Sequence, residues 1–333
     1  MFSFASINRF TPAALAIFSG FFISSVLIPQ PLGRSEIVTQ SEVTLLAAVH
    51  DLVSPHPETE EIEPESIPLI SFEAYDPYTP REKRDIGKYT AVNPDVRGYI
   101  KIPGAGMEEV VLQSSNGDRD FYLYKDWRGD YSKHGSVYFD NGFSLTDPAH
   151  KIWVLYGHNN ANGSGFPAIH KWNPTRVGVE QALSFYKKHH IVELDTVYEG
   201  ADWQIFALFV HAANMQEDGE HFTFFWNFNF DHDEDYQRYI DNIRIRSLIV
   251  TPVRVTVDDT IALLSTCITD GYNYYGNQYK NWRLVMALRK ASGGVDPKFD
   301  ASPVYVNPNP LMPDIWHKNT GKQKPAKAPA PAG

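Results

Sequence analysis

Short hydrophobic runs recur eight times between residues 98 and 288, and polar stretches that contain glycine, aspartate or asparagine separate several of them. The runs are rich in β-branched and aromatic side chains, which is typical of strands. Eight short strands within one region favour a barrel or a sandwich. The predicted strands are residues 98–103, 109–113, 136–139, 151–156, 191–194, 203–210, 260–264 and 283–288.

Three other segments have the patterns of helices. Residues 179–188 and 233–246 carry apolar side chains at helical spacing. Thr79-Pro80 forms a helix start, which predicts a helix over residues 80–92. The segment 233–246 places four apolar side chains on one face: Tyr236, Tyr239, Ile240 and Ile243.

The N-terminal part of the chain contains one long uncharged stretch. Residues 10–33 carry no charge and are mostly apolar, so they predict a signal-anchor that crosses the membrane once. The arginine that precedes them assigns residues 1–9 to the cytoplasm and the rest of the chain to the outside. The predicted localisation is therefore the cell membrane, with a single pass and an extracytoplasmic domain.

Composition divides the remainder into a folded domain and two polar flanks. Residues 34–79 mix proline, glutamate and serine, which is typical of an extracytoplasmic linker. Residues 296–333 form a Pro/Lys/Ala-rich tail that is predicted to be disordered. One folded domain is therefore expected over residues 80–295.

Charge and cysteine content exclude some classes of protein. The formal net charge is -10, which argues against a nucleic-acid partner because nucleic acid attracts basic surfaces. The chain has 1 cysteine, Cys267, so it cannot form an intramolecular disulfide. The thiol is left for chemistry, for intermolecular pairing or for packing as a small hydrophobic group.

Three residues at strand ends form a candidate catalytic set. Cys267 lies where an apolar run meets a loop rich in Gly, Asn and Asp, and this position favours a nucleophile near solvent. His158 follows another predicted strand and is suited to exchange protons, and Arg283 begins a third. A thiolate that attacks a carbonyl needs a proton donor for the leaving amine and a positive group for the oxyanion. Arg289 competes with Arg283, but it lies further along the same strand, nearer the opposite rim.

These residues occur in segments that resemble one known family. Leu264-Ser-Thr-Cys267 resembles the signature of sortases, the surface cysteine transpeptidases, and Tyr156-Gly-His-Asn159 resembles their histidine motif. The resemblance is greatest to class B and covers roughly residues 80–290. It includes the segments Asn93–Pro103, Asp118–Leu123 and Tyr131–Asn141.

The resemblance implies a mainly β protein of a Gram-positive bacterium. The implied fold is an eight-stranded sortase-type β-barrel with an N-terminal helical extension and a few peripheral helices. By the same resemblance Cys267 is the nucleophile, His158 is the general acid and base, and Arg283 stabilises the oxyanion or the substrate. No metal or organic cofactor is implied. Substrate-binding residues are expected at Asn141, Thr266 and Asn159.

The implied reaction is transpeptidation. The enzyme would cleave a C-terminal sorting signal, such as Asn-Pro-x-Thr-x, in a secreted protein and form a thioacyl-enzyme. An amine of peptidoglycan or a pilin lysine would then accept the acyl group. The reaction would anchor proteins to the cell wall or join pilin subunits.

Two alternative functions stay open. A thiol peptidase would form the same thioacyl intermediate and release it to water. A membrane-tethered peptide-binding protein would keep the barrel with an inert Cys267. The sequence does not identify the anchored protein or the acceptor. Most of the segment 216–235 has no close counterpart in the resemblance, and the segment 271–282 is an insertion longer than class B leads us to expect.

Overall fold

The fold is described from a computed structural model. All described residues belong to one compact unit, Ser71–Gly333. The predicted anchor (10–33) and linker (34–79) lie outside the described residues, as does most of the segment 271–282. The described residues are 81–213, 222–225, 228–268, 281–291 and 299–324.

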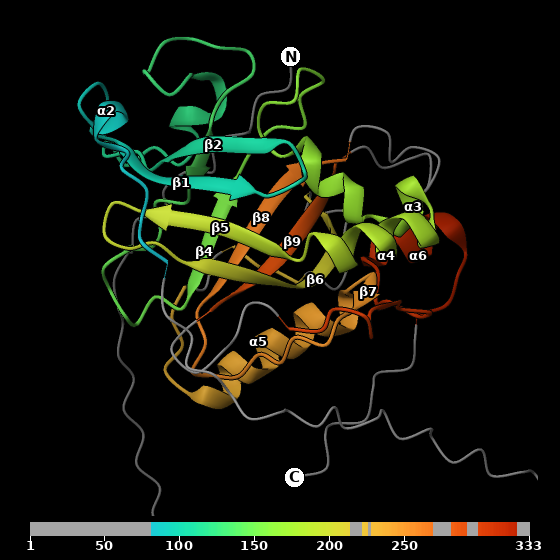
Figure 1. Ribbon diagram of the computed structural model, residues 1–333. Coiled ribbons are helices and arrows are strands. Elements are labelled where there is room, and N and C mark those ends of the chain that lie inside the picture. The colour runs from blue at the N-terminus through green and yellow to red at the C-terminus, as the bar shows by residue number, and fades with distance from the viewer. Residues whose placement is uncertain (1–80, 214–221, 226–227, 269–280, 292–298, 325–333) are drawn as a thin grey trace, which may run out of the picture. The chain divides into compact units, whose positions relative to one another are not determined.

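Eight strands close into a barrel, which confirms the fold class that the sequence predicts (Figure 1). Their order around the barrel is β1-β2-β3-β4-β8-β9-β6-β5, and β5 pairs with β1 to close it. Most neighbouring strands are antiparallel, but β2 with β3 and β4 with β8 form parallel pairs. The barrel strands are β1 Val96–Ile102, β2 Met107–Leu112, β3 Val137–Phe139, β4 Ile152–Tyr156, β5 Ile191–Thr196, β6 Asp202–Ala212, β8 Ile261–Cys267 and β9 Trp282–Lys290.

One apolar core joins the strands of the barrel. The ring of Trp153 lies 5.3 Å from that of Trp203 and stacks on Phe143 at a centroid distance of 6.2 Å. Phe139 meets Trp153 edge-on at 6.2 Å. All four side chains are buried, and aromatic groups of this size supply much of the apolar area that a core removes from water.

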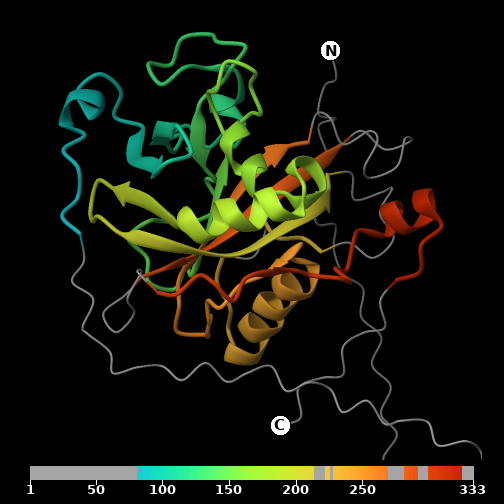
Figure 2. The ribbon, with the colours of Figure 1, turned by 45° about the vertical axis from the view of Figure 1, so that its right-hand side comes forward.

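Helices surround the barrel, and two of them have the predicted bounds. Figures 1 and 2 show the long helix α5 on one side of the barrel and the helices α3 and α4 on another. The face of α5 that the sequence predicts to be apolar is buried. The helices are α2 Gly87–Thr90, η2 Phe121–Tyr124, η3 Pro167–Trp172, α3 Pro174–Val177, α4 Val179–Lys188, α5 Asp233–Arg246 and α6 Asp314–Thr320, and a separate two-stranded sheet pairs β7 Ile249–Val250 with β10 Tyr305–Val306.

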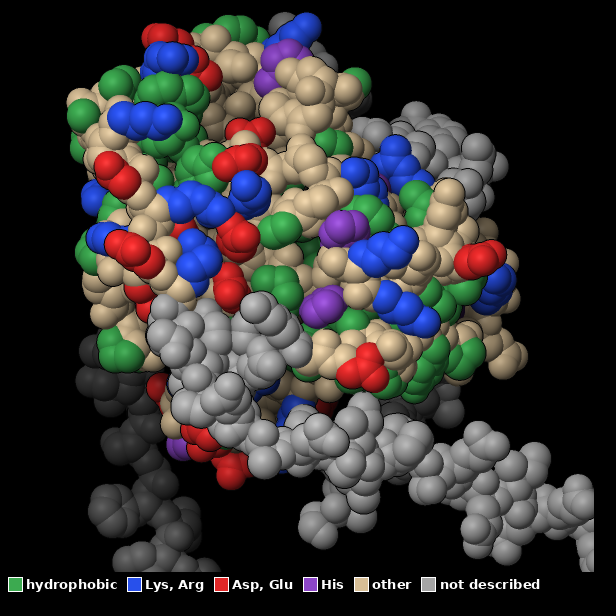
Figure 3. Space-filling view, viewed as in Figure 1, with side chains coloured by type: hydrophobic (Ala, Val, Ile, Leu, Met, Phe, Trp, Pro, Cys, Tyr) green, Lys and Arg blue, Asp and Glu red, His purple; other side chains and the backbone are tan. Residues whose placement is uncertain are grey.

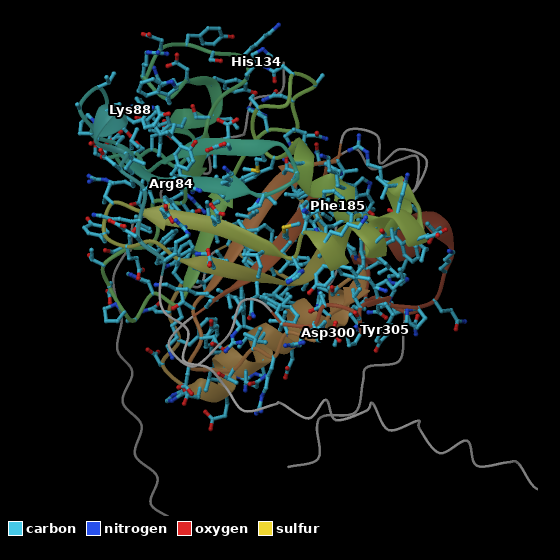
Figure 4. All side chains as sticks on the ribbon, viewed as in Figure 1. Arg84, Lys88, His134, Phe185, Asp300 and Tyr305 are labelled. Atoms are coloured by element: carbon cyan, nitrogen blue, oxygen red, sulfur yellow. The ribbon has the colours of Figure 1, made fainter. Side chains whose placement is uncertain are left out.

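The helix predicted over residues 80–92 is wrong for most of that length, because only α2 is helical. Arg81 and Arg84 both reach back to β5, where Arg81 forms an ion pair with Asp195 and Arg84 forms one with Glu193. Figure 4 labels Arg84 among the side chains on this side of the barrel. Acidic and basic side chains lie side by side over this part of the surface (Figure 3). Asp195 is fully buried, so its carboxylate would carry a large desolvation cost without these partners. Contacts with the barrel therefore override the local helix signal.

The tail predicted to be disordered is folded over residues 299–324, so that prediction is wrong there. β10 pairs with β7, and the Leu311 N–H donates to the Ile245 carbonyl at 2.8 Å. Both views show this segment running past α5 and β7 (Figures 1 and 2). The Pro/Lys/Ala bias belongs to the last residues alone, whereas the folded part supplies apolar side chains to the main core: Ala301, Val304, Met312 and Ile315.

The part of the chain that the structure describes holds no helix long and apolar enough to cross a membrane. This finding contradicts the predicted single-pass localisation in the cell membrane. The segment on which that prediction depended, residues 10–33, lies outside the described residues.

We expect Met312→Ala to lower the free energy of unfolding by about 2–4 kcal/mol, because truncating a buried methionine leaves a cavity. Met312 is 5% exposed. Lys318→Ala, at an exposed position of α6, is the control and should change the stability by less than about 0.5 kcal/mol. Urea unfolding of the full chain measures both variants. Equally small effects would mean that residues 299–324 do not support the core.

Candidate active site

Strand register brings the ends of neighbouring strands together. β8 lies between β4 and β9 in the barrel. β8 ends at Cys267, which is paired with Arg283 near the start of β9. Directly opposed residues of antiparallel strands project from the same face of a sheet, so the thiol and the guanidinium share one face. Both side chains are only partly buried.

His158 reaches the same position from the other side of β8. β4 runs parallel to β8, and its last residue, Tyr156, is paired with Ser265. Beyond that pair the Gly157 N–H donates to the Ser265 carbonyl at 3.1 Å, and the Thr266 hydroxyl donates to the Gly157 carbonyl at 2.7 Å. The alignment therefore continues past the end of β4 and brings His158 level with the end of β8. The three residues predicted to be catalytic lie in one row across the strands.

Two residues that were expected to bind substrate make contacts within this row. Thr266 is 2% exposed, and its hydroxyl is engaged by Gly157. The Asn159 side-chain amide donates to the Cys267 carbonyl at 3.1 Å. These contacts tie the chain beside His158 to the strand that carries the thiol. They favour a role in holding the backbone over direct contact with a substrate.

The imidazole of His158 has a fixed partner on one ring nitrogen. Its Nε2 lies 2.8 Å from the Leu123 carbonyl oxygen, which can only accept, so Nε2 donates its proton there. Nδ1 is therefore the nitrogen that can take up and release a proton. The ring of Tyr124 lies 5.8 Å from the imidazole, centroid to centroid. A histidine held in one tautomer is prepared for general acid–base chemistry.

Two glycines permit the close approach of backbone to His158. A Cβ atom at Gly135 would lie 2.9 Å from Cδ2 of His158 and closer still to the Leu123 carbonyl oxygen. A Cβ atom at Gly165 would lie 2.9 Å from the His158 backbone nitrogen and closer still to its carbonyl oxygen. Both residues also have positive φ angles, +60° and +81°, which L side chains rarely adopt. A side chain at either position would therefore displace His158 or its partner.

Of the two competing arginines, Arg283 is the one beside Cys267. Its Nη1 donates to the Trp282 carbonyl at 3.2 Å. Arg289 is paired with Ile261 at the other end of β8, and its Nε lies 2.8 Å from Asp259 Oδ1. The guanidinium of Arg289 is thus held in an ion pair away from the thiol.

A buried carboxylate lies next to the row. Asp140 is fully buried, forms an ion pair with Arg119 and accepts a hydrogen bond from the Tyr156 hydroxyl at 2.8 Å. Burial raises the pKa of Tyr156 and that of Tyr138, and the nearby Asp140 raises both further. The positive charges of Arg119 and Arg283 act in the opposite direction on the pKa of Tyr138. Both phenols are therefore neutral hydrogen-bond donors at physiological pH.

Asn141, the third residue expected to bind substrate, follows this carboxylate in the chain. Its Nδ2 donates to the Asp118 carbonyl at 3.1 Å. Its Oδ1 is buried and accepts no hydrogen bond from any described residue. The amide of Asn141 is therefore held by the connection between β2 and β3, while its buried side-chain oxygen has no hydrogen-bond donor among the described residues.

Sequence reasoning missed two residues, one that contacts the row and one that contacts the loop after His158. His170, in η3, is 2% exposed and its Nε2 lies 3.1 Å from the Cys267 carbonyl oxygen. Glu109, in β2, accepts a hydrogen bond from the Gly165 N–H at 3.2 Å. No motif marks either residue. Each residue has a charged neighbour in the chain, Glu108 or Lys171, so local composition does not distinguish it.

The functional groups of the row are a thiol, an imidazole and a guanidinium. They can supply a nucleophile, a proton carrier and a positive group for an oxyanion, which is the set that acyl transfer through a thioester requires. Within the described residues, no group of three or more His, Cys, Asp or Glu side chains is placed to hold a metal ion. The fold and the site together define a cysteine-dependent acyl transferase or peptidase on a closed barrel.

Comparison with known proteins gives the family. No protein-family model matches the chain. The chain is 31% identical to sortase B of Staphylococcus aureus over 183 residues, which cover 55% of this chain and 66% of that protein, just under two thirds of its length. A solved Staphylococcus aureus sortase B–substrate complex matches with a TM-score of 0.51 and 25% identity, over 64% of this chain and 87% of that chain. A solved sortase B complexed with triglycine matches with a TM-score of 0.50 and 27% identity, over 62% and 85%.

The chain therefore belongs to the sortase family of cysteine transpeptidases, and within it to class B. The resemblance that the sequence motifs indicate is confirmed, and so is the sortase-type barrel.

Glu109 gives a pH-dependent test of the loop that carries His158. Burial raises the pKa of the Glu109 carboxyl, and the hydrogen bond from Gly165 opposes this shift less strongly. The fold therefore favours the protonated form. The stability that this carboxyl contributes is complete below its unfolded pKa and is lost as pH rises through the raised folded pKa.

We expect Glu109→Gln to keep the hydrogen bond from Gly165 through its amide oxygen and to remove this loss. The melting temperature of the variant should rise relative to that of the parent as pH increases from about 4 to about 8. Thermal unfolding of both proteins across that range measures the difference. A difference that is constant with pH would contradict the assignment.

Proposed function

We propose that the chain cleaves a C-terminal sorting signal of secreted proteins and transfers the acyl fragment to an amine. The observation that carries the proposal is the row in which Cys267 is opposed by Arg283 in β9 and joined through the β4–β8 register to His158. A thiol, a proton carrier and a cation at adjacent strand ends can act together on one carbonyl group.

In the first step the thiolate of Cys267 attacks the threonyl carbonyl carbon of a signal such as Asn-Pro-x-Thr-x. A C–S bond forms, and the carbonyl electron pair moves to the oxygen. When that pair returns, the C–N bond breaks, and the leaving amine takes a proton from Nδ1 of the His158 imidazolium. Nε2 keeps its hydrogen bond to the Leu123 carbonyl throughout, so the ring does not need to turn.

The backbone around Cys267 argues that Arg283 stabilises the oxyanion. In many acyl transferases the amide that follows the nucleophile donates to the oxyanion. Here the Ile268 N–H donates to the Trp282 carbonyl at 3.0 Å, so the sheet already uses it. The guanidinium of Arg283 is a donor of the opposite charge on the same face as the thiol. We therefore assign the oxyanion to Arg283 rather than to a backbone amide.

An amine completes the reaction. Its lone pair attacks the thioester carbonyl, one of its protons passes to the neutral imidazole of His158, and the C–S bond breaks to return the thiolate. The sortase B that was solved with triglycine supports an acceptor with a free amino terminus. We propose a peptidoglycan amine as the acceptor for this chain, with a pilin lysine as the alternative.

The sorting signal would lie along the face of the sheet that holds the row. The Staphylococcus aureus sortase B–substrate complex supports a peptide substrate for this barrel. Asn141 follows the buried Asp140 in the chain, and its Oδ1 accepts no hydrogen bond from any described residue. We propose that Asn141 helps to orient the signal.

Mass spectrometry of the full chain incubated with Asn-Pro-x-Thr-x peptides tests the proposal. We expect an adduct on Cys267 that passes to triglycine when it is added. Cys267→Ala should abolish the adduct, and His158→Ala and Arg283→Ala should each slow its formation by about 100-fold or more. Arg283→Lys is the matched control for charge, and it should recover less than parental activity because it lacks the fork of donors.

Two outcomes would overturn parts of this account. Release of the acyl group to water at the same rate with and without an amine would make the protein a thiol peptidase. Peptide binding without an adduct across a broad panel would make it a binding protein.

Gly135→Ala should lower the acyl-transfer turnover by about tenfold or more, because a misplaced catalytic group is costly even over small distances. The new Cβ would compress Leu123 and His158, whereas a Cβ at Gly129, which also has a positive φ of +97°, meets nothing within 4 Å. Gly129→Ala is therefore the control for backbone strain. Turnover measured beside the melting temperature separates the two effects, and equal losses in both variants would contradict the role of the close approach.

A further inference from the structure

The backbone carbonyl of Cys267 accepts two hydrogen bonds from side chains. One comes from Nδ2 of Asn159 at 3.1 Å, and the other comes from Nε2 of His170 at 3.1 Å. Such a concentration of donors on one carbonyl is unusual at the end of a strand, where ladder contacts normally stop. The residue whose carbonyl is held in this way is the nucleophile.

Local structure fixes His170 firmly. η3 begins at Pro167 and directly follows the loop after His158, which is closed where the Phe166 N–H donates to the His158 carbonyl at 2.7 Å. Within η3, Trp172 is fully buried and its indole N–H donates to the His189 carbonyl at 3.0 Å. A donor on a rigid, buried turn is preorganised, so it loses little entropy when it binds its acceptor.

The hydrogen bond from His170 to the Cys267 carbonyl lies at the point where β8 ends. Cys267 is the last residue of β8, and the next residue, Ile268, makes one further backbone hydrogen bond, to Trp282. Holding the Cys267 carbonyl fixes the rotation of the peptide group that follows the nucleophile. The direction of the Cα–Cβ bond, and so the place of Sγ relative to His158, depends on that rotation.

We propose that His170 is a positioning residue for Cys267, which holds the nucleophile level with His158 by donating to the Cys267 carbonyl. This inference rests on the proposed function, because it assigns His170 a part in the same acyl transfer. His170 does not touch the substrate or the reacting atoms. It acts together with Asn159, which reaches the same carbonyl from the residue next to His158.

The hydrogen bond from His170 to the Cys267 carbonyl determines which substitutions of His170 can test the proposal. A carbonyl only accepts, so Nε2 of His170 must carry a proton, and it does so in the neutral Nε2–H tautomer and in the imidazolium alike. A glutamine side chain can present an N–H group near the place of Nε2. Phenylalanine fills a similar volume with a ring and has no donor. His170→Gln and His170→Phe therefore differ mainly in the hydrogen bond.

Steady-state kinetics of the full chain give the first readout. We expect His170→Phe to lower kcat for acyl transfer by about tenfold or more while KM for the peptide stays within about threefold, because the nucleophile moves and the peptide site does not. His170→Gln should return kcat to within about threefold of the parent. A kcat for His170→Phe within about twofold of the parent would overturn the proposal, and so would equal losses in both variants that follow the loss of melting temperature.

Alkylation of Cys267 by iodoacetamide gives a readout that needs no sorting signal. If the parent transfers no peptide, the proposed function fails, but alkylation still tests the positioning of the thiol. We expect His170→Phe to slow alkylation near neutral pH by about threefold or more, with His170→Gln close to the parent, because a displaced thiol loses the nearby imidazole as its base. Equal alkylation rates in all three proteins would overturn the proposal.

A double-mutant cycle with Asn159→Ala separates a shared role from two independent ones. Both side chains donate to one acceptor, so the effects of His170→Phe and Asn159→Ala on kcat should be non-additive. Additive effects would mean that the two contacts act separately and would overturn the joint positioning of Cys267.

Discussion

The parallel pairing of β4 with β8 is the constraint on which the site depends. It aligns Tyr156 with Ser265, and the contacts of Gly157 carry that alignment to the ends of both strands. The antiparallel register of β8 with β9 then adds Arg283 to the row. A slip of one residue in either pairing would turn a catalytic side chain to the other face of the sheet. Strand register therefore determines which side chains meet at the site. The closed barrel protects that register because it has no free edge strand.

The contacts around Cys267 and His158 depend on this strand register. The sheet uses the amide of Ile268, which is why we propose that a side chain binds the oxyanion. The Leu123 carbonyl sets the tautomer of His158, and Gly135 is needed for that carbonyl to come close. The carbonyl of Cys267 is in turn held from two sides. The contacts to the His158 ring come from the connection between β2 and β3, and those to the Cys267 carbonyl come from the connection between β4 and β5. The loops, and not the strands alone, therefore determine the geometry of the thiol and the imidazole.

The sequence predicted much of the fold and of the candidate site, and each wrong prediction has a physical cause. All eight barrel strands and the helices α4 and α5 were found, because local patterns of apolar residues reflect the faces that the core buries. The helix over residues 80–92 failed because Arg81 and Arg84 bind carboxylates on β5, which no local pattern reveals. The folded part of the tail was missed because composition averages apolar anchors such as Met312 with the polar residues after them. The row itself was predicted from motifs, but His170 contacts it through a hydrogen bond to backbone, and such a contact leaves no trace in residue spacing.

In the proposed mechanism Arg283, and not a backbone amide, receives the oxyanion beside Cys267. A crystal structure of the full chain with a threonyl ketone analogue of the sorting signal bound covalently to Cys267 tests it most directly, because the adduct places an oxygen where the oxyanion forms. We expect a guanidinium nitrogen of Arg283 within about 3 Å of that oxygen, with the Ile268 amide still hydrogen-bonded to the Trp282 carbonyl. An oxygen held by the Ile268 amide, with Arg283 turned away, would contradict it.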